Sequence, residues 1–361
     1  MENLVNLIDL TTEELTEYVV SLGFKQFRAA QIRRWLLRGT VDFADMTDIG
    51  IADRGLLNAN CRTGLPRIAE KHISALDGTV KYLFELWDGN VIESVVMRYR
   101  HGISICISSQ VGCRMGCVFC ASTIGGLTRN LSSGEMLGQI ICAQADIGER
   151  ISSVVLMGIG EPLDNYDNVV RFLHEVTSPD SLDIGSRHIS LSTSGLADRI
   201  IRLSQEDLQI TLSISLHCAD DAGRSELMPV NRRWNIEELL TSCRKYFEIT
   251  GRRISFEYTL ISGKNDSMDD AGKLADCLMR YLRGIPFHVN LIPVNPVEGK
   301  AFAAGERDSI ERFRDALEKR RINATIRRRL GSDINASCGQ LRKKHIESVI
   351  PPDIRQELSE N

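Results

Sequence analysis

The chain has 361 residues, 43% hydrophobic and 25% charged, which suits one large domain plus a smaller one. It has no apolar run near the ~20 residues that span a bilayer, and its acidic start is not typical of a secretory signal. We therefore expect a cytoplasmic protein with no membrane partner. The formal net charge of −4 argues against a protein that binds nucleic acid through its overall charge.

The first 65 residues predict a small helical domain. Thr11 and Glu14 have the spacing of a capping box, which begins a helix that ends at Gly23. A second amphipathic helix is expected over Phe27–Leu37. Residues 70–99 alternate like strands around turns that contain glycine, so we assign residues 66–100 to a β-hairpin linker.

From residue 103 the pattern alternates between apolar strands and amphipathic helices, which predicts a parallel sheet. Strands are expected at 103–108, 153–157, 188–192, 209–215, 254–260 and 288–292, and helices at 134–147, 166–176, 196–203, 236–250, 269–282 and 308–320. These units suit an α/β fold, a partial (β/α)6 barrel over residues 101–345 with a tail at 346–361; an open doubly wound sheet is the alternative. A further strand over 324–328 is compatible with the pattern.

Ten cysteines in a chain of this kind argue against a disulfide scaffold. Three of them, Cys113, Cys117 and Cys120, have a C-x3-C-x2-C spacing just after the first barrel strand. Zinc prefers four ligands in paired spacings, and no second pair is present. Three thiolates on a [4Fe-4S] cluster leave one iron open. That iron can chelate S-adenosylmethionine, whose reduction releases a 5′-deoxyadenosyl radical. The motif resembles the radical S-adenosylmethionine (radical SAM) superfamily.

Polar residues and a glycine turn follow the later strands. A single such residue is more often a cap or a loop residue. Together, however, they lie at the carboxyl ends of successive parallel strands, on the face of the cysteine motif. We predict that they bind S-adenosylmethionine, and that Glu161 accepts from its ammonium group; the set is Gly160, Glu161, Ser192, Ser215, Leu216, His217 and Asn295.

Several motifs in order resemble the RlmN family over about residues 10 to 345. They are the runs 106–113 and 157–162, Ser215-Leu-His217, Leu227-Met-Pro229, the run 288–293 and Ala336-Ser-Cys338-Gly-Gln-Leu341. Members of this family are dual-specificity RNA methyltransferases that act at carbon-2 of adenine. A sister group, Cfr, methylates carbon-8 of the same ribosomal adenosine.

The resemblance implies a methyl relay that uses two S-adenosylmethionine molecules per turnover. Cys338 takes a methyl group from the first, and the radical from the second removes a hydrogen atom from that methyl group. The carbon radical adds to the adenine, Glu93 accepts the ring proton, and Cys106 attacks the sulfur to leave a transient Cys106–Cys338 disulfide. The residues alone would make both cysteines small buried hydrophobes and Glu93 a solvated strand carboxylate.

The resemblance also implies 23S rRNA and tRNA as substrates and an electron-donor protein such as a flavodoxin or ferredoxin; we expect a monomer. Three alternatives stay open. The chain could be a carbon-8 enzyme. It could be a radical enzyme without an RNA substrate, which would need neither the cysteine pair nor the helical front domain. It could also be a zinc-bound RNA-binding protein, which would lack the brown absorbance of a cluster.

Overall fold

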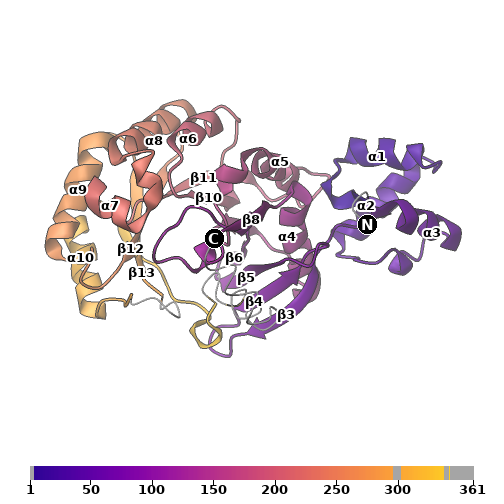
Figure 1. The fold of residues 1–361 in the computed structure, drawn as a ribbon, viewed down its shortest axis with the longest axis horizontal. Helices are drawn as coiled ribbons and strands as arrows, with labels where there is room; N and C mark the ends of the chain where they lie inside the picture. Colours follow the sequence, from indigo (N-terminus) through magenta and orange to yellow (C-terminus); the bar gives the residue numbers. More distant parts are fainter. Residues whose placement is uncertain (1–3, 296–301, 337–340, 342–361) are drawn as a thin grey trace.

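A computed structural model describes residues 4–295, 302–336 and 341. Its centre is a ten-stranded sheet in the order β14-β13-β12-β11-β10-β9-β6-β5-β4-β3 (Figure 1). All neighbours from β6 to β14 are parallel. They are β6 (Gly102–Cys106), β9 (Ser153–Leu156), β10 (Ile189–Thr193), β11 (Thr211–Ser215), β12 (Ile254–Leu260), β13 (Phe287–Pro293) and β14 (Ala324–Ile326).

The helices follow one another along the outside of this parallel sheet, where α4 packs on α5, α6 on α8, α8 on α9 and α9 on α10 (Figure 1). Their bounds are α4 (Ser133–Ile147), α5 (Tyr166–Thr177), α6 (Ala197–Leu203), α7 (Asp221–Leu227), α8 (Ile236–Thr250), α9 (Met268–Leu282) and α10 (Arg307–Lys319). Among the described residues, β3 and β14 are the sheet edges and do not pair with each other, so the barrel is open. The predicted fold class, a partial α/β barrel, is confirmed, with β14 as a further strand.

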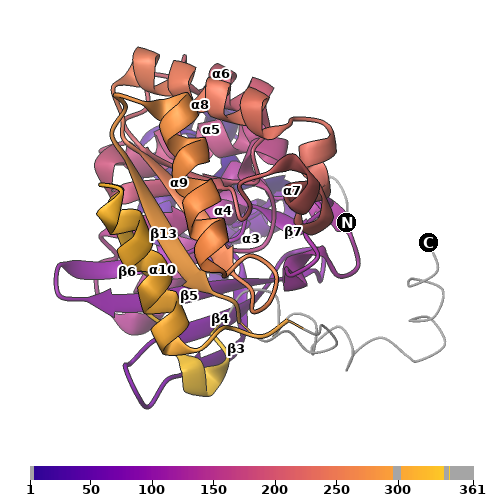
Figure 2. The same ribbon diagram turned by 90° about the vertical axis from the view of Figure 1, so that its left-hand side faces the viewer.

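Three strands extend the sheet beyond β6 in antiparallel register: β5 (Val91–Tyr99), β4 (Val80–Glu85) and β3 (Arg67–Ile73). The segment that the sequence predicts as a hairpin is therefore part of the main sheet. Residues that follow β14 cross back to the turn between β3 and β4, where Asp333 Oδ1 accepts a hydrogen bond from Ser74 Oγ at 2.7 Å (Figures 1 and 2). This crossing connects the two edges of the open barrel.

Residues 4–60 include the helices α1 (Thr12–Ser21), α2 (Phe27–Leu37) and α3 (Ile51–Asn60), which lie together at one end of the molecule (Figure 1). The predicted capping box is present, because Thr11 Oγ1 accepts from Glu14 N and Glu14 Oε2 from Thr11 N. The strand β1 (Val5–Asn6) pairs with β2 (Cys61–Arg62), which returns the chain to the barrel. The division of the chain into domains stays a prediction.

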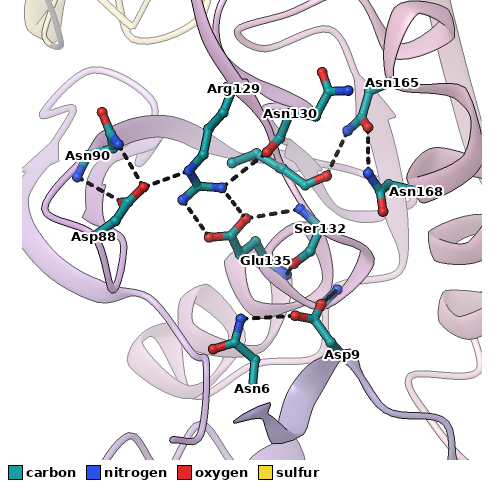
Figure 3. Close-up of polar contacts among 12 residues, drawn as sticks. Asn6, Asp9, Asp88, Asn90, Arg129, Asn130, Ser132, Glu135, Asn165 and Asn168 are labelled. Carbon is teal, nitrogen blue, oxygen red and sulfur yellow. Dashed lines mark hydrogen bonds and ion pairs between the residues drawn. The ribbon is translucent and has the colours of Figure 1, made fainter. Parts of the chain in front are cut away.

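Polar contacts attach the helical region to the barrel (Figure 3). Asp9 Oδ1 accepts a hydrogen bond from Gly134 N at the start of α4, at 2.8 Å. The guanidinium of Arg129 donates to Asp88 at 2.6 Å and to Glu135 at 2.7 and 2.8 Å, which joins the β4–β5 turn to the first turn of α4. Segments far apart in sequence are thereby held beside the loop that carries the cysteine motif.

The sequence patterns missed a two-stranded sheet, β7 (Gln110–Gly112) with β8 (Leu127–Asn130), which encloses the cysteine loop. Gly112 has a φ of +82°, and a Cβ there would lie 2.0 Å from the carbonyl oxygen of Gly126. Only glycine permits this close approach of the two strands. In the described ranges, no helix is both long and apolar enough to cross a membrane.

Candidate active site

Cys113, Cys117 and Cys120 line one cavity of about 200 Å³ at the carboxyl ends of the parallel strands. Two backbone hydrogen bonds hold their loop: Cys113 N donates to Gly126 O at 2.9 Å where the loop begins, and Val118 N donates to Leu227 O at 3.0 Å near its middle. The acceptor, Leu227, belongs to the Leu227-Met-Pro229 motif, to which the sequence analysis assigned no role. The three thiols therefore face a shared space from a supported loop.

Burial raises the pKa of the Cys113 thiol to about 12, and it raises that of Cys117 further. The charges of Cys120 and Cys113 add to the rise at Cys117, and all three cysteines line the same cavity. Metal coordination removes such protons outright. No three metal-ligating side chains of the described residues close around a single ion. In a four-iron cluster each thiolate binds a different iron, and three thiols around one cavity suit that arrangement.

Most of the residues predicted to bind S-adenosylmethionine line the same cavity: Gly160, Glu161, Ser192, Ser215 and His217. Leu216 is fully buried and does not line it. Asn295 lies on a neighbouring cavity instead. The fold thus brings together the ends of β9, β10 and β11 beside the cysteines. The binding roles of these residues stay predictions.

Glu161 is almost fully buried, and its carboxylate accepts from Ser194 N at 2.6 Å and from Leu163 N at 3.0 Å. Its own amide donates to Gln110 Oε1 at 2.8 Å. Burial raises the pKa of Glu161, and the hydrogen bonds from Ser194 and Leu163 oppose that rise. The carboxylate therefore organises the loops after β9 and β10 in addition to facing the cavity.

The glycines of the 157–162 motif allow a close contact between two loops. A Cβ on Gly158 would lie 2.5 Å from Ile107 O, and one on Gly160, which has a φ of +111°, would lie 2.7 Å from Gln110 Cβ. The glycines thus let the loop after β9 pack against the segment that precedes the cysteines.

His217 follows β11 in a left-handed conformation with a φ of +56°. Its Nδ1 accepts from Thr259 N at 2.9 Å, which assigns the ring proton to Nε2, and its ring lies edge-on to Phe119 with the centroids 4.9 Å apart. Burial and the nearby charge of Arg224 lower the pKa of His217 to about 3. The imidazole is therefore a neutral hydrogen-bonding group at physiological pH.

Arg224, which the sequence analysis did not identify, is fully buried beneath this edge. It donates to Ser194 O at 2.7 Å, Ser215 O at 3.1 Å and Leu216 O at 3.2 Å. It therefore ties the ends of β10 and β11 together, and Leu216 contributes a backbone oxygen to this support. Glu257 was also missed; it is a buried carboxylate on β12 that lines the cavity and accepts from Asn290 at 2.7 Å.

A second cavity of about 470 Å³ adjoins the first, and both are lined by Phe119, Cys120, Met157, Thr259, Ile292 and Arg327. Its walls include Val95, Met97 and Cys106 from β5 and β6, and Arg328 and Arg329 from the chain after β14. Cys106 is the strand partner of Val95. A cluster cysteine and the predicted resolving cysteine thus border one space.

Glu93 lies on β5 and, by the alternation of strand residues, faces the same side as Val95 and Met97. It is 2% exposed, and its Oε2 lies 3.1 Å from Lys81 Nζ. The expected solvated carboxylate is therefore buried. Cys338 lies outside the described residues, but Asn335 and Ala336, which precede it, line the larger cavity. The catalytic roles of these residues stay predictions.

The open α/β barrel and the cysteine loop at its carboxyl edge define the radical SAM class of enzymes. The model of the radical SAM superfamily matches residues 107–275. A second family model, the ribosomal RNA large subunit methyltransferase N-terminal domain, matches residues 5–62. Membership of the superfamily implies a [4Fe-4S] cluster and S-adenosylmethionine, which agrees with the converging thiols.

Curated relatives narrow the class. A probable dual-specificity RNA methyltransferase RlmN of Clostridium acetobutylicum is 51% identical over 95% of this chain and 98% of its own length. The protein of the same name from Clostridium botulinum is 49% identical over 94% and 99%. The crystal structure of a radical SAM methyltransferase from Sphaerobacter thermophilus has a TM-score of 0.87 and 41% identity, and the match covers 93% of this chain and 98% of that one. This chain belongs to the RlmN family of radical SAM RNA methyltransferases.

Proposed function

We propose that this enzyme methylates carbon-2 of adenine in 23S rRNA and tRNA through a methyl-cysteine relay. The observation that carries the proposal is the joined pair of cavities. One is bordered by the cluster cysteines and the strand ends, and the other by Cys106 and by Ala336, two residues before Cys338. A radical formed in the first space can reach a methyl group carried into the second. Carbon-2 lies between two ring nitrogens and is electron-poor, so a carbon radical suits it better than a nucleophilic displacement.

When bound, a four-iron cluster on the three thiolates supplies one electron to the sulfonium of S-adenosylmethionine, generates the 5′-deoxyadenosyl radical and can take one electron back. The remaining steps belong to residues of this chain. The Cys338 thiolate takes the methyl group of a first S-adenosylmethionine, and sulfur–carbon bond formation releases S-adenosylhomocysteine. A second molecule is consumed when the radical removes a hydrogen atom from that methyl group.

The resulting carbon radical bonds to carbon-2, which joins enzyme and RNA through Cys338. Once the adduct has lost one electron and the ring proton, which Glu93 accepts, Cys106 attacks the Cys338 sulfur. The sulfur–carbon bond breaks, its electron pair stays with the carbon, and a proton completes the methyl group. The disulfide that remains needs two electrons from an external thiol. Cys106 suits this attack because it borders the larger cavity from β6.

An adenine buried in folded RNA must leave its stack to enter the cavity, which costs a few kcal/mol. Three arginines line the larger cavity, and their contacts with RNA phosphates can offset part of this unstacking cost: Arg327, Arg328 and Arg329. An electron-donor protein such as a flavodoxin or ferredoxin, a monomeric state and a cytoplasmic location complete the proposal.

Nucleoside mass spectrometry tests the proposal directly. The reconstituted enzyme is incubated anaerobically with S-adenosylmethionine, a reductant and unmodified rRNA or tRNA, and the RNA is digested. We expect 2-methyladenosine from wild type and none from Cys338→Ala. Cys106→Ala should accumulate a covalent protein–RNA adduct. The appearance of 8-methyladenosine would keep the relay but move the enzyme to the carbon-8 group, and normal turnover by Cys106→Ala would exclude the relay.

A further inference from the structure

Lys81 is a buried lysine that contacts both Glu93 on β5 and residues 331–336, the segment that leads to Cys338. It lies on β4 with 1% of its surface exposed. Its Nζ is 3.1 Å from Glu93 Oε2 on β5 and donates to the backbone oxygen of Asn335 at 3.0 Å. An ammonium group has donors for several acceptors. Here they link the predicted base to the segment that leads to Cys338.

The same segment is held by the turn between β3 and β4 through reciprocal carboxylate contacts. Asp77 Oδ2 on the turn accepts from Gly331 N at 2.8 Å. Asp333 on the segment accepts from Ser74 Oγ at 2.7 Å and from Ala75 N at 2.9 Å. Residues 331–336 are thus fixed on the β3–β4 hairpin at three places besides Lys81.

Residues 331–336 form a tight turn, which brings Asn335 to Lys81. Gly331 has a φ of +60°, and a Cβ there would lie 2.6 Å from Ala336 Cβ. Ala336 N also donates to Gly331 O at 3.0 Å. The chain is therefore folded back on itself just before Cys338, and Lys81 binds it at Asn335, inside that turn.

A buried charge is costly unless it is paired and hydrogen-bonded. A purely structural ion pair would need only Glu93 and Lys81. Lys81 also binds the backbone oxygen of Asn335, three residues before Cys338 in the chain. The strand partner of Lys81 is Val95, which lines the larger cavity with Cys106. Lys81 therefore fixes the Glu93 carboxylate relative to the backbone at Asn335.

We propose that Lys81 is a positioning residue. It holds the Glu93 carboxylate and residues 331–336, which lead to Cys338, in fixed relative positions for removal of the ring proton. The inference rests on the proposed function and deepens it. In the step concerned, the carbon-2–hydrogen bond of the adduct breaks, its electron pair stays in the ring, and the proton bonds to a Glu93 oxygen. Lys81 transfers no proton; its contacts hold the acceptor oxygen of Glu93 and the backbone at Asn335 in place.

The test is a single-turnover experiment on Lys81→Met, with wild type and Glu93→Gln in parallel. Enzyme already methylated on Cys338 is mixed anaerobically with S-adenosylmethionine, reductant and RNA, then quenched. Denaturing gels follow the covalent adduct, and mass spectrometry follows 2-methyladenosine. A separate incubation of unmethylated enzyme with S-adenosylmethionine measures Cys338 methylation by mass spectrometry. We expect Lys81→Met to resolve the adduct at least about tenfold more slowly, because a positioned base contributes about 10²–10⁴-fold. Cys338 methylation should change by less than about threefold, since Asp77 and Asp333 still hold the segment.

Lys71→Met is the matched control, because Lys71 lies on the adjacent strand and pairs with Asp146 at 2.6 Å, away from the segment. If Lys81→Met does not fold, Lys81→Gln, which keeps a donor without the charge, is measured in the same way. Resolution at the wild-type rate, equal losses in methylation and resolution, or the same slowing in Lys71→Met would each overturn the inference while Glu93→Gln still traps the adduct. If Glu93→Gln itself traps no adduct, the proposed role of Glu93 fails first, and the inference falls with it.

Discussion

The Glu161 carboxylate accepts a hydrogen bond of 2.6 Å from the amide of Ser194, which joins the loop after β9 to the loop after β10. Its other oxygen accepts from Leu163 N at 3.0 Å. A residue expected to bind the ligand's ammonium group therefore also shapes the pocket that would receive it. These two roles can be separated by experiment, because support of the loops can be measured without ligand and binding of the ammonium group cannot.

Glu161→Gln should destabilise the fold even in the absence of S-adenosylmethionine. A glutamine has one acceptor oxygen and one amide nitrogen, so one of the two buried backbone amides loses its partner, at a cost of about 1–3 kcal/mol. Urea denaturation of the apoprotein measures this loss. Glu149→Gln is the control: this carboxylate is exposed and pairs with Arg98 at the surface, where an ion pair contributes little, so the midpoint should change little. An unchanged midpoint for Glu161→Gln would mean that the carboxylate acts on the ligand alone.

Replacing any one of Cys113, Cys117 and Cys120 with serine should remove the cluster. Each thiolate binds a separate iron, so no neighbouring ligand compensates for its loss. Iron and sulfide content and the visible absorbance of reconstituted protein report the result, and formation of 5′-deoxyadenosine should fall below detection. Cys277→Ser, on α9 and outside both cavities, is the control and should keep the full cluster. Full iron content in any of the three variants would exclude that cysteine as a ligand.

Much of this architecture follows from local sequence patterns. The strand β12 was predicted with its observed bounds, Ile254–Leu260, where apolar side chains alternate with polar ones, and the helix predicted at 236–250 is α8 with the same bounds. The small sheet of β7 and β8 was missed because such short strands carry too few residues to show a period. The cysteine motif could be recognised because its three cysteines lie close together in the chain.

The residues that support the site from beneath could not be recognised in the sequence. Arg224, Lys81 and Glu257 are buried charges, and a charged residue in an isolated sequence indicates a solvated surface. Their partners lie in other segments of the chain, as Asn335 does for Lys81, 254 positions away. Only the folded chain shows that these charges are paired. The resemblance named Glu93 and Cys106, but their burial beside one cavity is a property of the tertiary structure.

Arg328→Gln should weaken RNA binding and reduce its dependence on salt. Arg328 is exposed at the rim of the larger cavity, where a substrate phosphate would pass. Loss of one phosphate contact lowers the slope of log K against log salt by roughly 0.7–0.9. Filter binding or anisotropy at several salt concentrations measures it. Arg312→Gln, exposed on α10, is the matched control. Equal effects of both variants would show that overall charge, rather than this rim, attracts the RNA.

His217→Asn should make the protein less sensitive to acid. Burial and Arg224 lower the pKa of His217 to about 3, whereas an exposed histidine has a value near 6.5. Between these values the unfolded chain binds more protons than the native one, so stability is complete above about pH 6.5 and is lost as pH falls toward 3. For one group the slope reaches at most about 1.4 kcal/mol per pH unit.

Asparagine is the appropriate replacement because it tolerates the positive φ at this position and its side-chain oxygen can accept from Thr259 N. Urea denaturation of wild type and His217→Asn at intervals from pH 7.5 to 4.5 compares the two slopes. We expect curves that are parallel above about pH 6.5 and diverge below it, with wild type losing stability faster. Parallel curves over the whole range would mean that His217 binds a proton as readily in the native state as in the unfolded chain, and the imidazole would then be a cation below about pH 6.5.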